Sequence, residues 1–271
     1  MSEKIKKPPV CLTIAGLDPS GGAGVIADVK TFTAFGCFAT VAVASVTFQN
    51  TTGVFGAVHQ TADSVRRQVE PIIADYEIAA VKTGMLPTRE IIEEVARLIE
   101  VNQLQNIVID PVVRSTSGFD LIDDAALAAL IERLFPLANL ITPNLSEAER
   151  IVKRPIKTVE DIREAAGEMH RLGARNVLMK GGHFETKDRK ARDYLSLAGE
   201  MHVLEAEWID TTSTHGTGCT LASAIAANLA LGNDLLRSVK AAKEFVNNAI
   251  RNAPGLGRGN SPIMIETIRG I

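Results

Sequence analysis

The chain has 271 residues, 46% of them hydrophobic, and this length can bury the core of one large α/β domain. Its 29 Lys and Arg residues against 32 Asp and Glu residues give a formal net charge of -3. No block of like charge is long enough to form a binding surface for nucleic acid or an anionic membrane. The composition therefore disfavours polyanionic partners, and we expect neither nucleic acid nor a membrane as a partner.

The cysteines and the N-terminal segment indicate the compartment. Cys11, Cys37 and Cys219 cannot all pair and show no CxxC spacing, which predicts a reducing compartment and no structural zinc. Pro8 and Pro9 interrupt the basic N-terminal stretch before a short apolar run, so we predict no signal peptide. No stretch approaches the roughly 18 apolar residues of a membrane span. These features predict a cytoplasmic protein.

Short apolar runs alternate with amphipathic stretches through the first two thirds of the chain. Apolar runs that predict buried strands cover residues 10–15, 40–46, 79–83, 106–110, 139–142 and 176–180. Apolar residues at three-to-four spacing predict helices over 23–35, 62–76, 88–101, 123–134 and 159–172. This alternation predicts an α/β fold with a mainly parallel sheet covered by helices on both faces.

The last third of the chain has a different pattern. Residues 192–198 and 201–208 predict a hairpin around Gly199 and Glu200, and two long helices follow over 217–231 and 235–252. The sequence shows no internal repeat, low-complexity tract or linker-like change in composition. We therefore expect a single domain spanning residues 1–271.

Polar and glycine-rich segments follow the predicted strands. Ligands collect beyond the carboxyl ends of the strands in an open parallel sheet. We therefore expect these segments to line one rim of the sheet. They are residues 16–22, 49–51, 84–85, 110–111, 142–144 and 180–183.

The segment His215-Gly216-Thr217-Gly218-Cys219 leads from a loop into a helix of small residues. The first N–H groups of a helix have no partner within it, glycines allow close approach, and the helix dipole favours negative charge. The segment predicts an anion hole, with an ordinary glycine turn as the alternative. Cys219 lies in the first helical turn, which should lower its pKa and make it a base or a nucleophile; the alternative is a packed helix cysteine.

Two nucleotide-binding fingerprints are incomplete in this sequence. The segment Gly22-Ala23-Gly24-Val25-Ile26-Ala27 fits G-x-G-x-x-G/A, but the next predicted strand carries no acid for a ribose. Gly16 and Gly21 have P-loop spacing, yet Gly22 and Ala23 stand where Lys and Ser or Thr are required. What remains is a backbone turn that encloses a ligand or a tight turn of structural value.

A group suited to phosphoryl transfer lies on the same predicted rim. Asn144 and Glu147 are three residues apart where a helix begins, and Asp110 and Lys180 end strands. Transfer needs positive charge and a divalent cation, and Mg²⁺ binds few protein carboxylates. Three of these residues also have a structural explanation. Glu147 could be a partner of the helix dipole, Asp110 a turn residue and Lys180 a solvated lysine at the end of a strand. Together with the turn of residues 215–219, the group predicts a small-molecule kinase.

The ordered motifs resemble the hydroxymethylpyrimidine/phosphomethylpyrimidine kinase family of thiamine biosynthesis, a branch of the ribokinase-like superfamily. The matching segments are residues 15–24, 27–32, 49–51, 82–86, 109–112, 142–147, 179–183 and 214–220. The resemblance implies a ribokinase-like three-layer α/β/α fold and an ATP- and Mg²⁺-dependent enzyme, which we expect to be a homodimer. The implied substrates are 4-amino-5-hydroxymethyl-2-methylpyrimidine and then its monophosphate, which becomes the diphosphate.

The resemblance also implies roles for residues at matching positions. Those expected around the pyrimidine are Gln49, Asp28, Gly16, Ala23, Met85 and Val112. Those expected at the nucleotide phosphates are Asn144 and Lys180, with Asp110 and Glu147 at the metal. Those expected at the transferred phosphoryl group are Gly216, Thr217, Gly218 and Cys219. We expect the Cys219 thiolate to deprotonate the substrate hydroxyl while backbone amides stabilise the equatorial oxygens.

The sequence departs from the family pattern at two places. Residues 113–118 read Val-Arg-Ser-Thr-Ser-Gly where the family has an Ala-Lys-Ser-Gly version, so we assign no phosphate or lid contact there. Leu17 replaces a small polar residue. Both differences bear on local substrate contacts rather than on the reaction.

Three other functions were weighed against this one. A pyridoxal kinase shares the phosphate machinery, although Gln49 and Met85 favour an aminopyrimidine. A cysteine hydrolase would use Cys219 with His215, but the sequence places no evident acid to orient the histidine. The third alternative is a nonenzymatic pyrimidine-binding protein.

Overall fold

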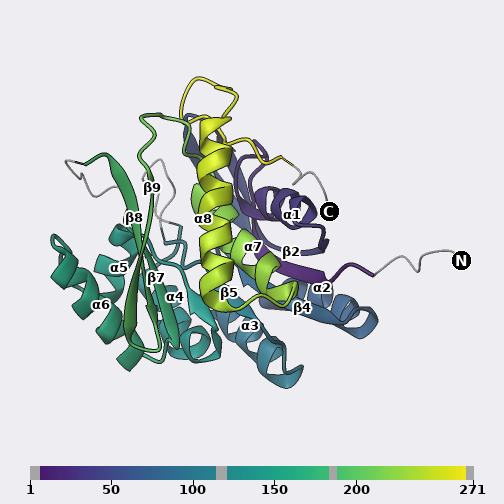
Figure 1. Cartoon of the computed structure of the whole chain (residues 1–271). Coiled ribbons are helices and arrows are strands. Elements are labelled where there is room, and N and C mark those ends of the chain that lie inside the picture. Colours follow the sequence, from purple (N-terminus) through teal and green to yellow (C-terminus); the bar gives the residue numbers. More distant parts are fainter. Residues whose placement is uncertain (1–6, 114–120, 183–187, 267–271) are drawn as a thin grey trace, which may run out of the picture.

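The computed structural model describes residues 7–113, 121–182 and 188–266 (Figure 1). The described strands are β1 (Val10–Leu17), β2 (Phe38–Asn50), β3 (Gly53–His59), β4 (Ile78–Thr83), β5 (Ile107–Ile109), β6 (Leu140–Ile141), β7 (Asn176–Lys180), β8 (Lys190–Leu197) and β9 (Glu200–Glu207). The described α-helices are α1 (Gly24–Ala34), α2 (Ala62–Asp75), α3 (Arg89–Val101), α4 (Asp124–Ala129), α5 (Leu145–Val152), α6 (Val159–Arg171), α7 (Thr217–Ala230) and α8 (Leu235–Arg251).

All of these strands belong to one sheet in the order β3-β2-β1-β4-β5-β6-β7-β8-β9. Strands β2, β1, β4, β5, β6 and β7 are parallel. Strand β3 pairs antiparallel with β2 at one edge, and β8 and β9 extend the other edge antiparallel to β7. The predicted mainly parallel sheet is confirmed, and the predicted hairpin is formed by β8 and β9.

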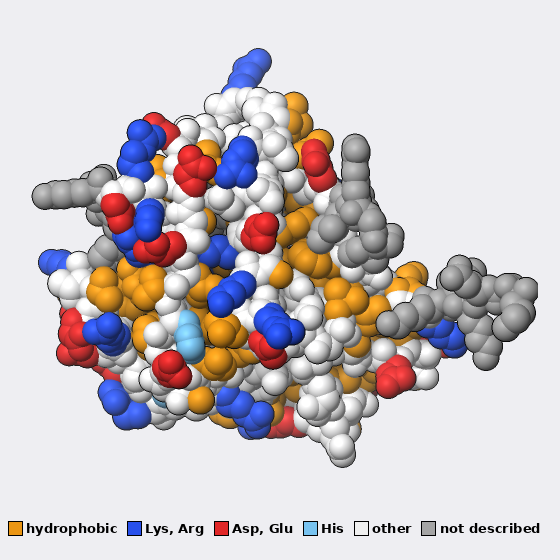
Figure 2. All heavy atoms as spheres, viewed as in Figure 1, with side chains coloured by type: hydrophobic (Ala, Val, Ile, Leu, Met, Phe, Trp, Pro, Cys, Tyr) orange, Lys and Arg blue, Asp and Glu red, His pale blue; other side chains and the backbone are white. Residues whose placement is uncertain are grey.

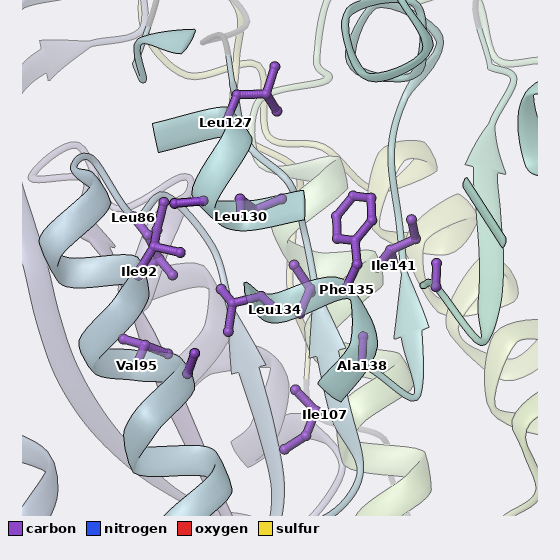
Figure 3. Packing of buried hydrophobic residues seen from close by; sticks show 14 of the residues in the cluster. Leu86, Ile92, Val95, Ile107, Leu127, Leu130, Leu134, Phe135, Ala138 and Ile141 are labelled. Atoms are coloured by element: carbon purple, nitrogen blue, oxygen red, sulfur yellow. The ribbon is translucent and has the colours of Figure 1, made fainter. Parts of the chain in front are cut away.

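Helices cover both faces of the sheet (Figure 1). Helices α1, α7 and α8 pack on one face, where Phe32, Phe35 and the small residues of α7 form one buried cluster. Helices α2 to α6 cover the other face over a larger cluster. Figure 3 shows part of that cluster, in which Ile92 and Val95 of α3 lie near Leu134. The sheet is therefore buried on both sides, as its continuous apolar runs predict.

The helix N-termini fall into two groups. Six of the eight described α-helices begin behind a Thr, Asp or Asn side chain that accepts a backbone N–H of the first turn. The other two, α1 and α7, begin at Ala23 and Gly216 with no side-chain cap. Their first N–H groups are therefore left for another partner.

Three elements differ from the sequence predictions. Strand β3 was not predicted, because its burial pattern lacks strict alternation and its pairing with the long β2 stabilises it. The helix predicted over 123–134 is α4 followed by a π-helical segment, Leu130–Leu134, and a 3₁₀ turn, Phe135–Leu137, which contains Pro136. Residues 145–152, predicted only as the start of a helix, form α5.

The surface carries charges of both signs. On the face shown in Figure 2, acidic and basic side chains are interspersed. Among the described helices, none combines the length and apolar character that crossing a membrane requires.

Candidate active site

A cavity of about 1380 Å³ lies beyond the carboxyl ends of the parallel strands. A pocket for one small ligand usually measures roughly 300–1,000 Å³, so this cavity has room for two ligands. Every rim segment predicted from the sequence contributes to its wall. The predicted site residues that line it are Gly16, Ala23, Gln49, Met85, Asp110, Val112, Asn144, Glu147, Lys180, Gly216, Thr217, Gly218 and Cys219.

The N-terminus of α7 is open toward this cavity. Gly216 precedes the helix with φ +88°, a left-handed conformation that favours glycine. A Cβ at Gly216 would lie only 1.8 Å from the carbonyl oxygen of Gly22, so the turn before α7 packs backbone to backbone against the turn before α1. No side chain caps α7, so its first N–H groups are left for another partner, and Gly218 and Cys219 of this first turn line the cavity.

Asp18 and His215 join the same two turns. Asp18 Oδ2 accepts a hydrogen bond from Ala23 N–H at 2.9 Å and lies 2.8 Å from His215 Nε2. Although burial alone raises the pKa of Asp18, hydrogen bonds from His215, Gln49 and Ser20 outweigh it and hold this pKa well below its usual range. No acid that could orient His215 is evident in the sequence, and the structure corrects this, because residues 197 positions apart meet across the turns.

A charged cluster lies against Gly218. Lys180 Nζ donates to Asp110 Oδ1 at 2.8 Å and lies 3.7 Å from Glu147 Oε2. Thr142 Oγ1 donates to Asp110 Oδ1 at 3.0 Å. A Cβ at Gly218 would lie 3.3 Å from Lys180 Nζ, so the absence of a side chain lets this cation approach the turn.

The pKa values of Asp110 and Glu147, the two carboxyl groups of this cluster, shift in opposite directions. Burial raises the pKa of Asp110, but the nearby ammonium groups of Lys180 and Lys82 outweigh that effect and lower it overall. Burial dominates at Glu147 and raises its pKa to about 7, despite the opposing charge of Lys180. The cluster can therefore hold both ionised and protonated carboxyl groups near neutral pH.

Asn144 and Glu147 also form the cap of α5. Asn144 Oδ1 accepts from Glu147 N–H at 2.9 Å, and Glu147 Oε2 accepts from Asn144 N–H at 2.7 Å. The sequence left open a structural role for Glu147 as a partner of the helix dipole, and the capping box, which was not predicted, gives both residues a structural role. Both residues also line the cavity, so the box fixes their polar groups at its wall.

The donor set fits Mg²⁺ better than an ion that needs a protein cage. Within the described ranges, no group of three or more His, Cys, Asp or Glu side chains is placed to hold a metal ion. Asp110 and Glu147 both lie near Lys180 and line the cavity. Mg²⁺ typically takes one or two carboxylates and completes its shell with water and phosphate oxygens.

Cys219 lines the cavity in the first turn of α7, but its pKa differs from the prediction. Burial raises the pKa of the thiol to about 11, and Asp28 and Asp110 add to this, while Lys82 and a hydrogen bond from Gly24 N–H oppose it. The prediction of a lowered pKa is therefore wrong. The helix N-terminus does not offset the loss of water around the sulfur.

Asp28 lies below the cavity rather than in its wall. Its carboxylate is 0% exposed and accepts from Thr13 Oγ1 and Ser223 Oγ, both at 2.6 Å, and from Lys82 Nζ at 2.9 Å. These donors occupy both of its oxygens, so direct contact with a pyrimidine, as the resemblance implied, does not fit this placement. Lys82 borders the cavity instead.

Sequence reasoning missed two parts of the wall. Lys82 is one; its signal was a charged residue within the apolar strand 79–83, where an unpaired charge would be costly. The other is an apolar end formed by Trp208, Ile209, Val246 and Ile250. These residues come from the end of β9 and from α8, and their sequences carry no motif that marks a ligand.

The two departures from the family pattern lie at the same wall. Leu17 and Val113 line the cavity. The rest of the divergent loop falls on residues 114–118, which lie outside the described residues.

Comparisons with known proteins identify the family of the chain. The family model of phosphomethylpyrimidine kinase matches residues 18–264. The chain is 39% identical over 251 residues to the hydroxymethylpyrimidine/phosphomethylpyrimidine kinase of Bacillus subtilis, covering 93% of this chain and 92% of that protein. It is 44% identical over 252 residues to the thiamine biosynthesis bifunctional protein ThiED of Geobacter sulfurreducens, covering 93% of this chain but only 51% of that protein.

A solved structure gives the same result for the fold. The ADP complex of Bacillus subtilis pyridoxal kinase superposes with a TM-score of 0.88 at 39% identity, covering 97% of this chain and 99% of that chain. The ribokinase-like fold expected from the motifs is thereby confirmed. Because its relatives are phosphotransferases and one family model covers nearly all of the described residues, the chain belongs to the phosphomethylpyrimidine kinase family.

Proposed function

We propose that the protein uses ATP and Mg²⁺ to phosphorylate the hydroxymethyl group of 4-amino-5-hydroxymethyl-2-methylpyrimidine and then converts the monophosphate to the diphosphate. The carrying observation is the uncapped N-terminus of α7, which shares its cavity with the charged cluster of Lys180, Asp110 and Glu147. The name of the Bacillus subtilis relative and the extent of the match support this substrate assignment and a role in thiamine biosynthesis.

The nucleotide would occupy the half of the cavity between the charged cluster and the apolar end. Lys180 would bind phosphate oxygens, and Asn144 would present its amide group from the capped start of α5. Val246 and Ile250 of α8 would cover one face of the base by apolar contact. Mg²⁺ held by Asp110 and Glu147 would supply positive charge to the transferred phosphoryl group.

The acceptor would occupy the half lined by Gly16, Ala23, Gln49, Met85 and Val112. The side-chain amide of Gln49 donates a hydrogen bond to Asp18. With its amide group toward Asp18, Gln49 would present its carbonyl oxygen to the amino group of an aminopyrimidine. The side chain of Met85, which approaches Gly16 closely, would pack against the ring.

Cys219 is proposed as the base for the acceptor hydroxyl. A thiol with a pKa of about 11 holds only about 10⁻⁴ of its population as thiolate at pH 7. That thiolate is a stronger proton acceptor than one of ordinary pKa. If Cys219 is the base, a positive charge must therefore lie near its sulfur and stabilise the thiolate when the ligands are bound.

The best test is phosphoryl-transfer profiling with hydroxymethylpyrimidine, its monophosphate and pyridoxal, each with ATP and Mg²⁺. We expect diphosphate formation from the first two substrates. A pyridoxal kinase is the second candidate, because the superposed Bacillus subtilis structure is a pyridoxal kinase. Preferred turnover of pyridoxal would replace the substrate assignment, and ligand binding without turnover would contradict the kinase proposal.

We also propose a cytoplasmic homodimer whose chain folds as one domain. The single sheet that holds all described strands supports one domain. Phe48, Phe55 and Val58 of β2 and β3 are more than half exposed and give the sheet edge an apolar surface that a second copy could cover. Light scattering of the wild type and of Phe55→Ser should show a dimer that the substitution weakens, and a wild-type monomer would contradict this.

A further inference from the structure

The buried ion pair of Lys82 and Asp28 is an unusual feature of β4 and α1. Both side chains are 0% exposed, and Lys82 Nζ lies 2.9 Å from each oxygen of Asp28. A buried ion pair is weak support for stability, because a well-packed apolar pair of similar volume is often as stable. Its presence beside the reaction cavity therefore needs a reason other than stability.

The two partners have different relations to the cavity. Asp28 is enclosed by Thr13, Ser223 and Lys82, which donate to its oxygens. Lys82 borders the cavity, and both of its hydrogen bonds to described residues go to Asp28. An ammonium group has three donors, so one remains for another acceptor.

Gly84 allows Lys82 Nζ to lie against the backbone at the carboxyl end of β4. A Cβ at Gly84 would lie 2.9 Å from Nζ, so any other residue there would displace the ammonium group. Burial lowers the pKa of Lys82, but the charges of Asp28, Cys219 and Asp110 outweigh it and raise this pKa overall, so the ammonium group stays charged within reach of Cys219. Lys180 supplies the other fixed cation, on the far side of Gly218.

We propose that Lys82 is a positioning residue for phosphoryl transfer, whose fixed charge, held by Asp28, stabilises the Cys219 thiolate before the step and the negative charge that develops on the acceptor oxygen during it. The inference rests on the proposed kinase function. In the step, the hydroxyl proton moves to the Cys219 sulfur and the acceptor oxygen bonds to the γ-phosphorus. The bond from that phosphorus to the bridging oxygen breaks, and its electron pair leaves on ADP. Preorganised charge of this kind acts mainly on the transition state.

The test removes both charges together, so that no unpaired charge remains buried. In Asp28→Asn/Lys82→Gln, the two amides can hydrogen-bond to each other and to Thr13 and Ser223. The control is Glu100→Gln/Arg133→Met, which removes a half-exposed ion pair of 3.3 Å between α3 and the segment Leu130–Leu134, outside the wall of the cavity. Steady-state kinetics with ATP, Mg²⁺ and hydroxymethylpyrimidine give kcat and both KM values, and thermal unfolding gives Tm.

We expect the double variant at positions 28 and 82 to lose about 100-fold in kcat, the size of effect seen when one preorganised donor is removed. Both KM values should stay within about twofold, and the control should behave as the wild type. A purely structural role would lower Tm and leave kcat per folded molecule unchanged; that outcome overturns the inference. If the wild type transfers no phosphoryl group, the proposed function fails instead, so the two failures are distinguishable.

Should this variant not fold, Asp28→Asn/Lys82→Met provides the same comparison with an apolar replacement. A measurement on the wild type is independent of both variants. With ¹⁵N label at lysine Nζ, binding of ADP, Mg²⁺, aluminium fluoride and hydroxymethylpyrimidine should move the Lys82 resonance. A resonance that stays in place contradicts a charge at the reacting atoms.

Discussion

Two Asp and Lys pairs flank the start of α7, and they differ in their access to the cavity. Asp28 and Lys82 are both 0% exposed, and Asp28 is saturated by protein donors. Asp110 and Lys180 lie at the wall, where Lys180 keeps 15% of its side chain exposed. The enclosed pair keeps its partners and supplies a fixed charge, whereas the open pair can exchange its partners for a metal ion and phosphate oxygens. One site thus holds a fixed charge in its floor and, in its wall, charges that can exchange partners.

Replacing one partner of the enclosed pair, Asp28 and Lys82, should have the largest effect on the free energy of unfolding. Lys82→Met leaves the Asp28 carboxylate buried without its cation, and removing one partner of a buried pair costs about 3–5 kcal/mol of unfolding free energy. Urea denaturation measures this loss. Asp28→Asn/Lys82→Met should recover most of it, and equal stability of the single variant and the wild type would contradict the enclosed state of the pair.

The pH dependence of Cys219 alkylation tests how the two pairs act together. The pKa of about 11 means that the reactive thiolate should increase tenfold per pH unit, or about 1,000-fold from pH 7 to pH 10. Iodoacetamide labelling followed by peptide mass spectrometry separates Cys219 from Cys11 and Cys37. A labelling rate that reaches its plateau below pH 8 would mean that the two lysines outweigh burial and the carboxylates.

Breaking the open pair should affect activity more than stability. Lys180→Met removes a cation that we place at the phosphates, and we expect a loss of about 10²–10³-fold in kcat. Asp110 borders the cavity, where water can replace the lost partner, so the loss of stability should be smaller than for Lys82→Met. Kinetics and urea denaturation of both single variants make the comparison, and the reverse order of stabilities would refute it.

Removing the threonine hydroxyl that donates to each Asp should give the smallest difference in stability between the two pairs. Thr13→Val removes a donor from the enclosed Asp28, and hydrogen bonds to charged groups contribute about 1.5–3 kcal/mol. Thr142→Val removes a donor from Asp110, where cavity water can replace it, so we expect a smaller loss. Thermal unfolding of the two matched variants measures the difference, and equal losses would mean that the pairs are equally enclosed.

Most of the architecture could be predicted because it depends on local patterns. Apolar runs and capped amphipathic stretches located most strands and helices, since periodicity and capping act within a few residues. Strand β3 was missed because its partner, not its own pattern, makes it a strand. The rim residues were found by the rule that ligands collect beyond parallel strands, which needs only the order of the elements.

The electrostatics of the site could not be predicted in the same way. The turn before α7 suggested an activated thiol at Cys219, but burial and the carboxylates of Asp28 and Asp110, which come from other elements, raise its pKa instead. Asp28 was expected at the substrate, and folding pairs it with Lys82, which lies 54 residues further along the chain. His215 was expected to lack an orienting acid, and folding brings it to Asp18.

The sequence alone determined the class of the fold, the edge of the sheet that carries the site and the glycine-rich turn at residues 215–219 that opens α7. These features follow from periodicity, element order and the geometry of a helix N-terminus, all of which are local. Only the tertiary structure decided which charges are enclosed and which face the cavity. Burial and pairing depend on contacts between distant segments, and they determine the ionisation of each group.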